Sequence, residues 1–428
     1  MNYNQNKKIM QVTERTVVIG VDIAKHKHFA RALNYRGVEL GKAISFNNSS
    51  NGFASLSYWI TELKKRHGLD HVIVGMEPTG HYWLNLEQWL RKHGMKQVLV
   101  NPAHAKKAKE LDDNSPTKND LKDAYTIAKL VVDGRYSEPH IPEEEYAELR
   151  LAMNHREQLV KDQNAIKCRI VNWLDRFFPE FTQVFKTWDG KAALSTLENF
   201  PLPADICELT AEEIVLTWRK TVSRSVGLKK AMELIEVARH SVGLDNGLSM
   251  ARNTLMSLLR QYRMLENELN ELECVVENLL KQIPAVSYML DIKGLGVITI
   301  AGIIAETGNL TNYRHHRQLQ RLAGLNLKEN SSGEHKGKTT IAKRGRPRLR
   351  ALLFRAIMPL VSKNPEFKAL HKHFTTRENN PLKKMQSMIA LCCRLLRVLF
   401  AIAKYEVPYN PDKVLESIKQ QNNLSLAA

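Results

Sequence analysis

The sequence predicts a mixed α/β domain at the amino end of the chain, followed by a long and mostly helical remainder. Between residues 16 and 134, short β-branched apolar runs alternate with helical patterns, and glycines follow several of these helical patterns. From about residue 142, apolar residues instead recur at three- and four-residue steps, as they do along amphipathic helices. With 428 residues, the chain is long enough for two or three domains.

Three strands are expected first. Residues 17–23 form a short β-branched apolar run, typical of a strand that is buried on both faces, and strands at 28–33 and 39–46 follow. Helices at 51–67, 81–93 and 103–111 then alternate with strands at 71–76 and 96–100, and a further helix at 118–133 follows. Three hairpin-connected strands before such an alternation are the ribonuclease-H-like pattern. A dinucleotide-binding fold would need a helix directly after the first strand.

The helical remainder carries two long amphipathic patterns, at residues 145–178 and 228–283. Patterns of this length are typical of antiparallel coiled-coil arms or dimerisation elements. Residues 179–226 lie between them as a less regular insertion, either ordered or flexible. The predicted domains are therefore 1–140, 141–285 and 286–428.

Composition and charge narrow the class of protein. Lys and Arg number 63 against 45 Asp and Glu, so the formal net charge is +18, and a polyanion is the expected partner. The five cysteines lack metal-ligand spacing, which argues against a zinc ribbon or a disulfide scaffold and favours a reducing cytoplasm. Arg394 and Arg397 interrupt the most apolar stretch, residues 388–403, so we expect no membrane span; we expect no secretory signal either.

Four acids of the predicted α/β domain stand out by position. Asp22 lies at the end of the first strand, Glu77 directly follows the strand at 71–76, and Asp120 and Asp123 project from one face at the start of a helix. Four carboxylates that met there would repel one another unless cations neutralised them, and Mg²⁺ prefers such oxygen ligands. Two such ions can stabilise the entering and leaving oxygens of a phosphodiester. The alternative is that each acid is a helix cap or a surface charge.

These acids lie in stretches that resemble the DEDD-type insertion-sequence transposases, which are related to the Piv-type DNA invertases and described as bridge-RNA-guided recombinases. In the first domain the matching stretches are GVDIAK at 20–25, GMEPTGHYW at 75–83, NP at 101–102 and KNDLKDA at 118–124. In the third they are GLG at 294–296, AGL at 323–325, SSG at 331–333 and KRG at 343–345. The resemblance covers both ends of the chain in the family's order, whereas the insertion at 179–226 is longer than the family requires.

The resemblance implies a Holliday-junction-resolvase-like (RuvC-like) first domain, in which the four acids hold Mg²⁺ or Mn²⁺. It also implies a mostly α-helical C-terminal transposase domain, in which Ser332 attacks a DNA phosphate and holds the strand as a phosphoserine ester. A serine hydroxyl is a poor nucleophile at neutral pH, so it needs a metal or a base beside it. Ser331 competes for this role, and the alternative is that Ser331-Ser332-Gly333 is only a polar turn.

A basic stretch surrounds this serine. Residues 313–355 contain twelve Lys or Arg against two Glu, which suits contacts with nucleic-acid phosphates, although a solvated basic face is the alternative. The glycines of GLG resemble a helix-hairpin-helix turn that approaches a phosphate, or they form a tight turn between core helices. The predicted nucleic-acid contacts are Lys293, Gly294, Gly296, Lys336, Lys338, Lys343, Arg344, Arg346 and Arg348.

The sequence therefore predicts a cytoplasmic transposase or site-specific recombinase of an insertion sequence, associated with the nucleoid when it is bound to DNA. The partners that the family implies are DNA at the element ends and target, a structured guide RNA, and further copies of the chain in a dimer or tetramer. Two alternatives remain: a metal-dependent structure-specific nuclease that does not use the serine, and a non-catalytic nucleic-acid-binding protein. Replacing Ser332 separates recombinase from nuclease, and replacing Asp120 separates either enzyme from a binding protein.

Overall fold

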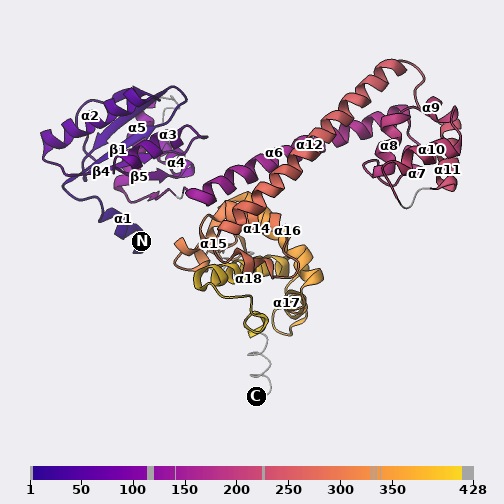
Figure 1. Ribbon diagram of the computed structural model, residues 1–428. Helices are drawn as coiled ribbons and strands as arrows, with labels where there is room; N and C mark the ends of the chain where they lie inside the picture. Colours follow the sequence, from indigo (N-terminus) through magenta and orange to yellow (C-terminus); the bar gives the residue numbers. More distant parts are fainter. Residues whose placement is uncertain are drawn as a thin grey trace. The chain divides into compact units, whose positions relative to one another are not determined.

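The computed structural model describes residues 3–112, 120–139, 141–223, 227–328, 331–332, 335–337 and 339–416. The chain divides into two compact units, Met1–Ile141 and Pro142–Ala428 (Figure 1). Each unit has its own hydrophobic cores, so each is described by itself.

The first unit contains a six-stranded sheet in the order β3-β2-β1-β4-β5-β6. The strands are β1 (Thr16–Asp22), β2 (Lys27–Leu33), β3 (Ile44–Asn47), β4 (His71–Met76), β5 (Lys96–Val100) and β6 (Tyr136–Ser137). Neighbours are antiparallel from β1 to β3 and parallel from β1 through β4 to β5, and β6 is antiparallel to β5. This mixed sheet is consistent with the predicted ribonuclease-H-like domain. The third strand is shorter than predicted, because only a single bridge, between Leu33 and Glu39, forms before Ile44.

Helices cover both faces of this sheet. They are α2 (Ser50–His67), α3 (Trp83–Lys92), α4 (Pro102–Asp112) and α5 (Asp120–Val132), and a short helix α1 (Tyr3–Ile9) precedes β1. Because side chains alternate along a strand, Val17, Ile19 and Val21 of β1 share one core with α2 and α3. Val18 points to the other face and shares a second core with α4 and α5. Burial on both faces explains why this strand is a continuous apolar run.

Two long antiparallel helices organise the second unit, α6 (Glu144–Phe177) and α12 (Leu248–Gln282). They lie side by side (Figure 1): the Trp173 indole donates a hydrogen bond to the Ala251 carbonyl at 2.9 Å, and Arg156 pairs with Glu273 at 2.7 Å. Their predicted role as coiled-coil dimerisation arms stays a prediction.

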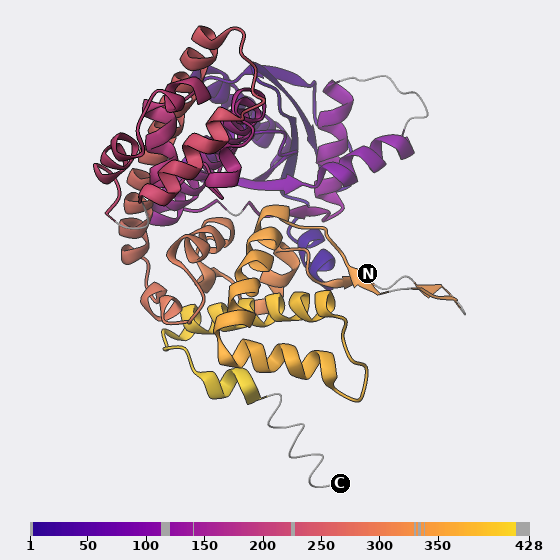
Figure 2. The same ribbon diagram turned by 90° about the vertical axis from the view of Figure 1, so that its right-hand side faces the viewer.

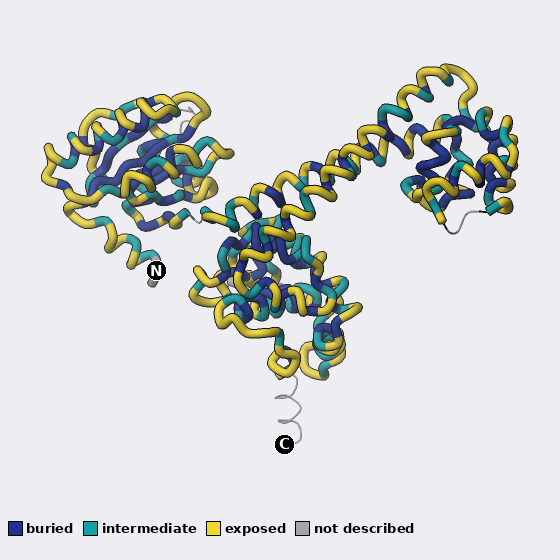
Figure 3. The backbone as a smooth tube through the Cα atoms, viewed as in Figure 1, coloured by how far each residue is buried: buried dark blue, intermediate teal, exposed yellow. Residues whose placement is uncertain are grey.

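The predicted insertion is helical in the part of the chain that the structure describes. Its helices are α7 (Phe181–Val184), α8 (Lys191–Asn199), α9 (Pro203–Cys207) and α10 (Ala211–Arg219), and α11 (Leu228–Arg239) follows. Trp218 is fully buried among them, and its indole donates a hydrogen bond to Thr196 Oγ1 at 2.8 Å. These helices share one core with the adjoining halves of α6 and α12 (Figure 3). The described part of the insertion is therefore ordered and packed.

The remaining helices pack on the other end of the α6–α12 pair. They are α13 (Val286–Leu290), α14 (Val297–Thr307), the 3₁₀ turn η1 (Leu310–Asn312), α15 (His316–Leu322), α16 (Pro347–Lys363), α17 (Pro365–Thr376) and α18 (Lys384–Tyr405). By length and composition, α18 is apolar enough to cross a membrane. Its Leu391, Leu395 and Leu399 are buried in the same core as α14 and α16, so it is a core helix of this unit.

Candidate catalytic site

Two of the predicted acids follow neighbouring parallel strands at the same level of the sheet. β1 pairs with β4 in a register that runs from Thr16↔His71 to Val21↔Met76. Asp22 ends β1 and Glu77 directly follows β4, so the same register brings them together at the carboxyl ends of the two strands. Ligand sites of α/β sheets form at this edge.

Paired glycines bring the third acid to the same edge. Gly20 of β1 is the register partner of Gly75 of β4, and α5 lies directly over both. A Cβ at Gly20 would lie 2.5 Å from the Ala128 backbone nitrogen and closer still to the Ala124 carbonyl oxygen. Any side chain here would therefore push α5 off the sheet. Because α5 lies this close, Asp123, which is next to Ala124, lies near enough to Glu77 for its carboxylate to raise the pKa of Glu77.

Opposing charges meet at this edge. Burial raises the pKa of Glu77 above its ordinary value, the ammonium of Lys109 on α4 opposes that rise, and the nearby Asp123 carboxylate adds to it. Asp123 Oδ2 lies 2.7 Å from Lys109 Nζ, and the two side chains are only 17% and 35% exposed. Asp22, Glu77 and Asp123 are called the acid cluster below. Lys109 was not predicted as part of it.

The fourth acid, Asp120, begins α5, but its side chain lies outside the described residues. Among the side chains that the structure does describe, no three Asp, Glu, His or Cys lie close enough together to hold a metal ion. The oxygen donors nevertheless fit Mg²⁺ or Mn²⁺, and the Lys109 ammonium shows that a cation is stabilised against Asp123.

The predicted serine lies in a two-residue strand that comes between α15 and α16 in the chain. Figure 2 draws short strands in the orange, C-terminal part of the chain. Four short strands are called the serine ribbon below: β7 (Leu327–Lys328), β8 (Ser331–Ser332), β9 (His335–Lys336) and β10 (Thr340–Ile341). β7 pairs with β10, and β8 pairs with β9 so that Ser332 lies opposite His335. The side chains of Ser331, Ser332 and Lys336, and all of Lys338, lie outside the described residues.

A tight backbone contact closes the base of the serine ribbon. Lys343 donates its N–H to the Gly324 carbonyl at 3.0 Å, and Arg346 donates its N–H to the Leu322 carbonyl at 2.7 Å. A Cβ at Gly345 would lie 2.5 Å from both the Gly324 nitrogen and the Leu322 carbonyl oxygen. The stretches AGL and KRG, separate in the sequence, are therefore the two sides of one junction.

Arg350 crosses this junction and was not predicted as a site residue. Its Nη1 donates to the Ala323 carbonyl at 2.9 Å and approaches the Lys343 carbonyl at 3.4 Å. The sequence does not predict these hydrogen bonds, because a run of basic residues does not show which arginine binds backbone carbonyls of its own chain.

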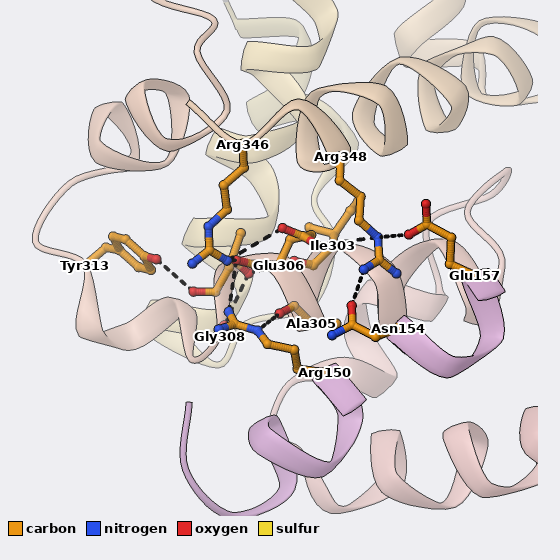
Figure 4. Close-up of polar contacts among 11 residues, drawn as sticks. Arg150, Asn154, Glu157, Ile303, Ala305, Glu306, Gly308, Tyr313, Arg346 and Arg348 are labelled. Carbon is orange, nitrogen blue, oxygen red and sulfur yellow. Dashed lines mark hydrogen bonds and ion pairs between the residues drawn. The ribbon is translucent and has the colours of Figure 1, made fainter. Parts of the chain in front are cut away.

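Two of the predicted nucleic-acid contacts, Arg346 and Arg348, are engaged within the second unit (Figure 4). Arg346 binds the Glu306 carbonyl and lies 3.6 Å from its carboxylate. Arg348 pairs with Glu157 at 2.7 Å and lies 3.5 Å from Glu306, and Arg150 donates to a carbonyl at the end of α14 at 2.7 Å. Burial and the neighbouring Arg346 lower the pKa of Arg150 to about 10. This arginine clasp, Arg150, Arg346 and Arg348 around Glu306, ties the start of α16 to α6 and α14.

The other described basic residues of the prediction are exposed. Lys343, Arg344 and Lys293 face solvent, and Gly296 leaves open space before the amino end of α14. Gly294 instead packs against α16, where a Cβ would lie 3.2 Å from the Pro359 carbonyl oxygen. A close turn between core helices therefore accounts for the conformation of Gly294.

Two family models match this chain, one toward each end. A model of DEDD transposases of the IS110 type, described as transposase, matches residues 19–179, a span that includes all four acids. A second model, described as transposase of the IS116/IS110/IS902 family, matches residues 286–372, a span that includes Ser332.

Three relatives extend these matches. The chain is 22% identical to an uncharacterized 44.8 kDa protein of insertion element IS116 from Streptomyces clavuligerus, over 94% of this chain and 98% of that protein. It is 23% identical to an uncharacterized 42 kDa protein of insertion element IS900 from Mycobacterium paratuberculosis, over 69% of this chain and 73% of that protein. It is also 29% identical to the pilin gene-inverting protein of Moraxella lacunata, over 37% of this chain and 49% of that protein.

Proposed function

Because this chain belongs to the IS110/IS116 family of transposases and is therefore a DNA recombinase, we propose that it breaks and rejoins DNA strands through a phosphoserine intermediate at Ser332. The observation that carries the proposal is the placement of the acids: Asp22 and Glu77 follow neighbouring strands at the same level of the sheet, and Asp123 lies near Glu77. The second matched region of the chain adds a serine in a short paired strand beyond a closed backbone junction.

The acid cluster, together with Asp120, is the proposed metal site. A divalent ion bound by these oxygens, Mg²⁺ or Mn²⁺, would supply Lewis-acid activation of a phosphodiester. The sheet register fixes Asp22 against Glu77, and the glycine contact fixes the start of α5, so the chain itself sets the spacing of the ligands.

Ser332 performs the covalent step. Its Oγ forms a bond to phosphorus, the bond from phosphorus to the leaving sugar oxygen breaks, the serine proton passes to a base, and the leaving oxygen takes up a proton. Attack by a strand-end hydroxyl on the phosphoserine reverses these bond changes and joins a new pair of strands. The ester conserves the phosphodiester bond energy, which hydrolysis would lose.

Nucleic-acid binding is proposed for the exposed basic residues. Lys293, Lys343 and Arg344 are available for phosphate contacts, as is the open amino end of α14 at Gly296. Phosphate contacts give affinity but no sequence choice, so a structured guide RNA that pairs with donor and target DNA is the proposed source of specificity. The net charge of +18 supports a complex with a guide RNA, donor DNA and target DNA, which together carry many phosphates. The active form is proposed to be a dimer or tetramer.

A covalent-adduct assay tests the serine step. The protein is co-expressed with RNA transcribed from the DNA that flanks its gene, and it is purified. It is then mixed with end-labelled element-junction DNA and Mg²⁺, and the products are separated on a denaturing gel. We expect an adduct for the unmodified chain and for Ser331→Ala, and none for Ser332→Ala or Asp123→Asn. An adduct that persists in Ser332→Ala but disappears in Ser331→Ala would move the nucleophile by one residue.

The same gel tests a hydrolytic alternative. The proposed metal site does not include the serine, so a metal-dependent nuclease is the second candidate. Cleavage without an adduct that continues in Ser332→Ala and stops in Asp123→Asn would support that candidate and reject the phosphoserine step.

A further inference from the structure

One lysine of α4 differs from its neighbours. Lys106 and Lys107 are exposed, as expected for residues of a basic solvated surface. Lys109 is half-buried, and its Nζ lies 2.7 Å from Asp123 Oδ2. The helix therefore directs this one ammonium group at the acid cluster.

The ammonium acts on more than one carboxylate. Besides its ion pair with Asp123, Lys109 opposes the rise in the pKa of Glu77 that burial and Asp123 cause. Removing the ammonium would leave the two carboxylates to repel each other in a partly desolvated place. Lys109 thus does in the chain alone what a metal ion would do in the proposed active form.

We propose that Lys109 is the built-in counter-ion of the acid cluster: it pairs with Asp123 until a divalent cation takes that carboxylate, and it then binds the DNA phosphate. The proposal rests on the proposed metal site. An ammonium and a divalent cation on the same carboxylate repel each other, so Lys109 must leave Asp123 when the site is loaded. A lysine is suited to this exchange, because its charge is a compact ammonium on a flexible four-carbon stem.

Once released from Asp123, the Lys109 ammonium can pair with a DNA phosphate at the acid cluster. A phosphodiester that reaches the acid cluster brings negative charge to the point that Lys109 has just left. Metal binding and phosphate binding are then coupled through one side chain. Without metal, Lys109 pairs with Asp123; when metal is bound, Lys109 pairs with a DNA phosphate.

Metal binding by the full-length chain without DNA tests the first half of the proposal. Mn²⁺ is titrated against the unmodified protein, Lys109→Ala, Lys109→Gln, Lys109→Arg and Lys107→Ala, and free Mn²⁺ is measured by electron paramagnetic resonance. We expect about fivefold tighter binding for Lys109→Ala and Lys109→Gln, because a competing, partly exposed ion pair is gone. Lys109→Arg keeps the charge, so its affinity stays near that of the unmodified chain, as does that of Lys107→Ala.

Unchanged or weaker Mn²⁺ binding in both neutral variants, with their fold verified by circular dichroism, would overturn the proposal. Asp123→Asn separates this failure from failure of the metal site. If Asp123→Asn binds Mn²⁺ as well as the unmodified chain does, the proposed metal site itself is wrong, and the inference about Lys109 falls with it.

DNA affinity at saturating Mn²⁺ tests the second half. If Lys109 contacts a phosphate, Lys109→Ala should lower the slope of log affinity against log salt by about 1, and Lys109→Arg should retain the slope. An identical slope in Lys109→Ala and the unmodified chain would reject the phosphate contact.

Discussion

The acid cluster of the first unit and the serine ribbon of the second are held in place by different interactions. β1 is almost completely buried, and its register with β4, together with the packing of α5 on Gly20 and Gly75, fixes the acids. The serine ribbon instead pairs over strands of two residues, and Leu327 and Lys328 at its start are exposed. Its fixed point is the backbone junction at its base. Packing therefore determines the position of the acids, and a few hydrogen bonds determine where the ribbon begins.

The largest effect expected from this comparison is that of Gly20→Ala. The added methyl group would overlap the backbone of α5, so the helix must move off β1. We expect a loss of more than about 3 kcal/mol in the free energy of unfolding of the first unit. Scanning calorimetry of the full chain should show the transition of this unit shifted to lower temperature or lost.

Gly227→Ala is the matched control, because a Cβ there meets no atom within 4 Å and the residue has extended backbone angles. A transition of the first unit that stays unchanged in Gly20→Ala would mean that the close approach of α5 does not determine the geometry of the acids.

The corresponding change at the ribbon is Gly345→Ala, with a smaller cost to stability. Its Cβ would meet the Gly324 nitrogen and the Leu322 carbonyl oxygen, so the junction must open. Because the surrounding chain is partly exposed, we expect about 2 kcal/mol of destabilisation of the second unit. The covalent adduct should be lost while Mn²⁺ binding stays normal. Normal adduct formation in this variant would show that the base of the ribbon does not position the serine.

A third change tests the arginine clasp that ties the ribbon's exit to α6. Glu306 is only 13% exposed, and it lies between Arg346 and Arg348. Glu306→Gln keeps the shape but removes the charge that offsets the guanidinium groups. We expect about 1 kcal/mol of destabilisation by chemical denaturation, with no change for the exposed Glu271→Gln on α12. Equal stability of the two variants would show that the clasp contributes packing only.

Much of the first unit could be predicted from the sequence, because buried β-branched runs and helix starts are local signals. Those signals placed Asp22 and Glu77 at strand ends and Asp123 in the first turn of a helix, where the structure has them. They do not single out Lys109, because the same helix also carries Lys106 and Lys107. Nothing local to a helix shows which of its lysines meets a carboxylate on another helix.

The second unit was less predictable. The helices of the insertion are four to nine residues long between Phe181 and Arg219, too short for a strong periodic signal, and they owe their order to burial against α6 and α12. The strands of the serine ribbon are two residues long, so no alternating pattern could show them. The pairing of AGL with KRG across the ribbon is likewise a tertiary contact, which neither stretch predicts alone.

The smallest expected effect concerns the cost of keeping Glu77 charged in the acid cluster. Because burial and Asp123 raise its pKa in the folded chain, the folded state favours the protonated form. Stability should therefore fall as pH rises from the ordinary value of 4.5 through the raised pKa, and the whole cost is present above it.

Glu77→Gln removes this cost, so with chelator present it should be slightly more stable than the unmodified chain at neutral pH and equal to it in acid. Denaturation curves between about pH 4 and pH 7 measure the difference, with the exposed Glu110→Gln as control. A variant that is less stable at neutral pH would mean that attraction of Glu77 to the Lys109 ammonium outweighs burial, and that the acid cluster is stabilised by its own lysine even without a metal ion.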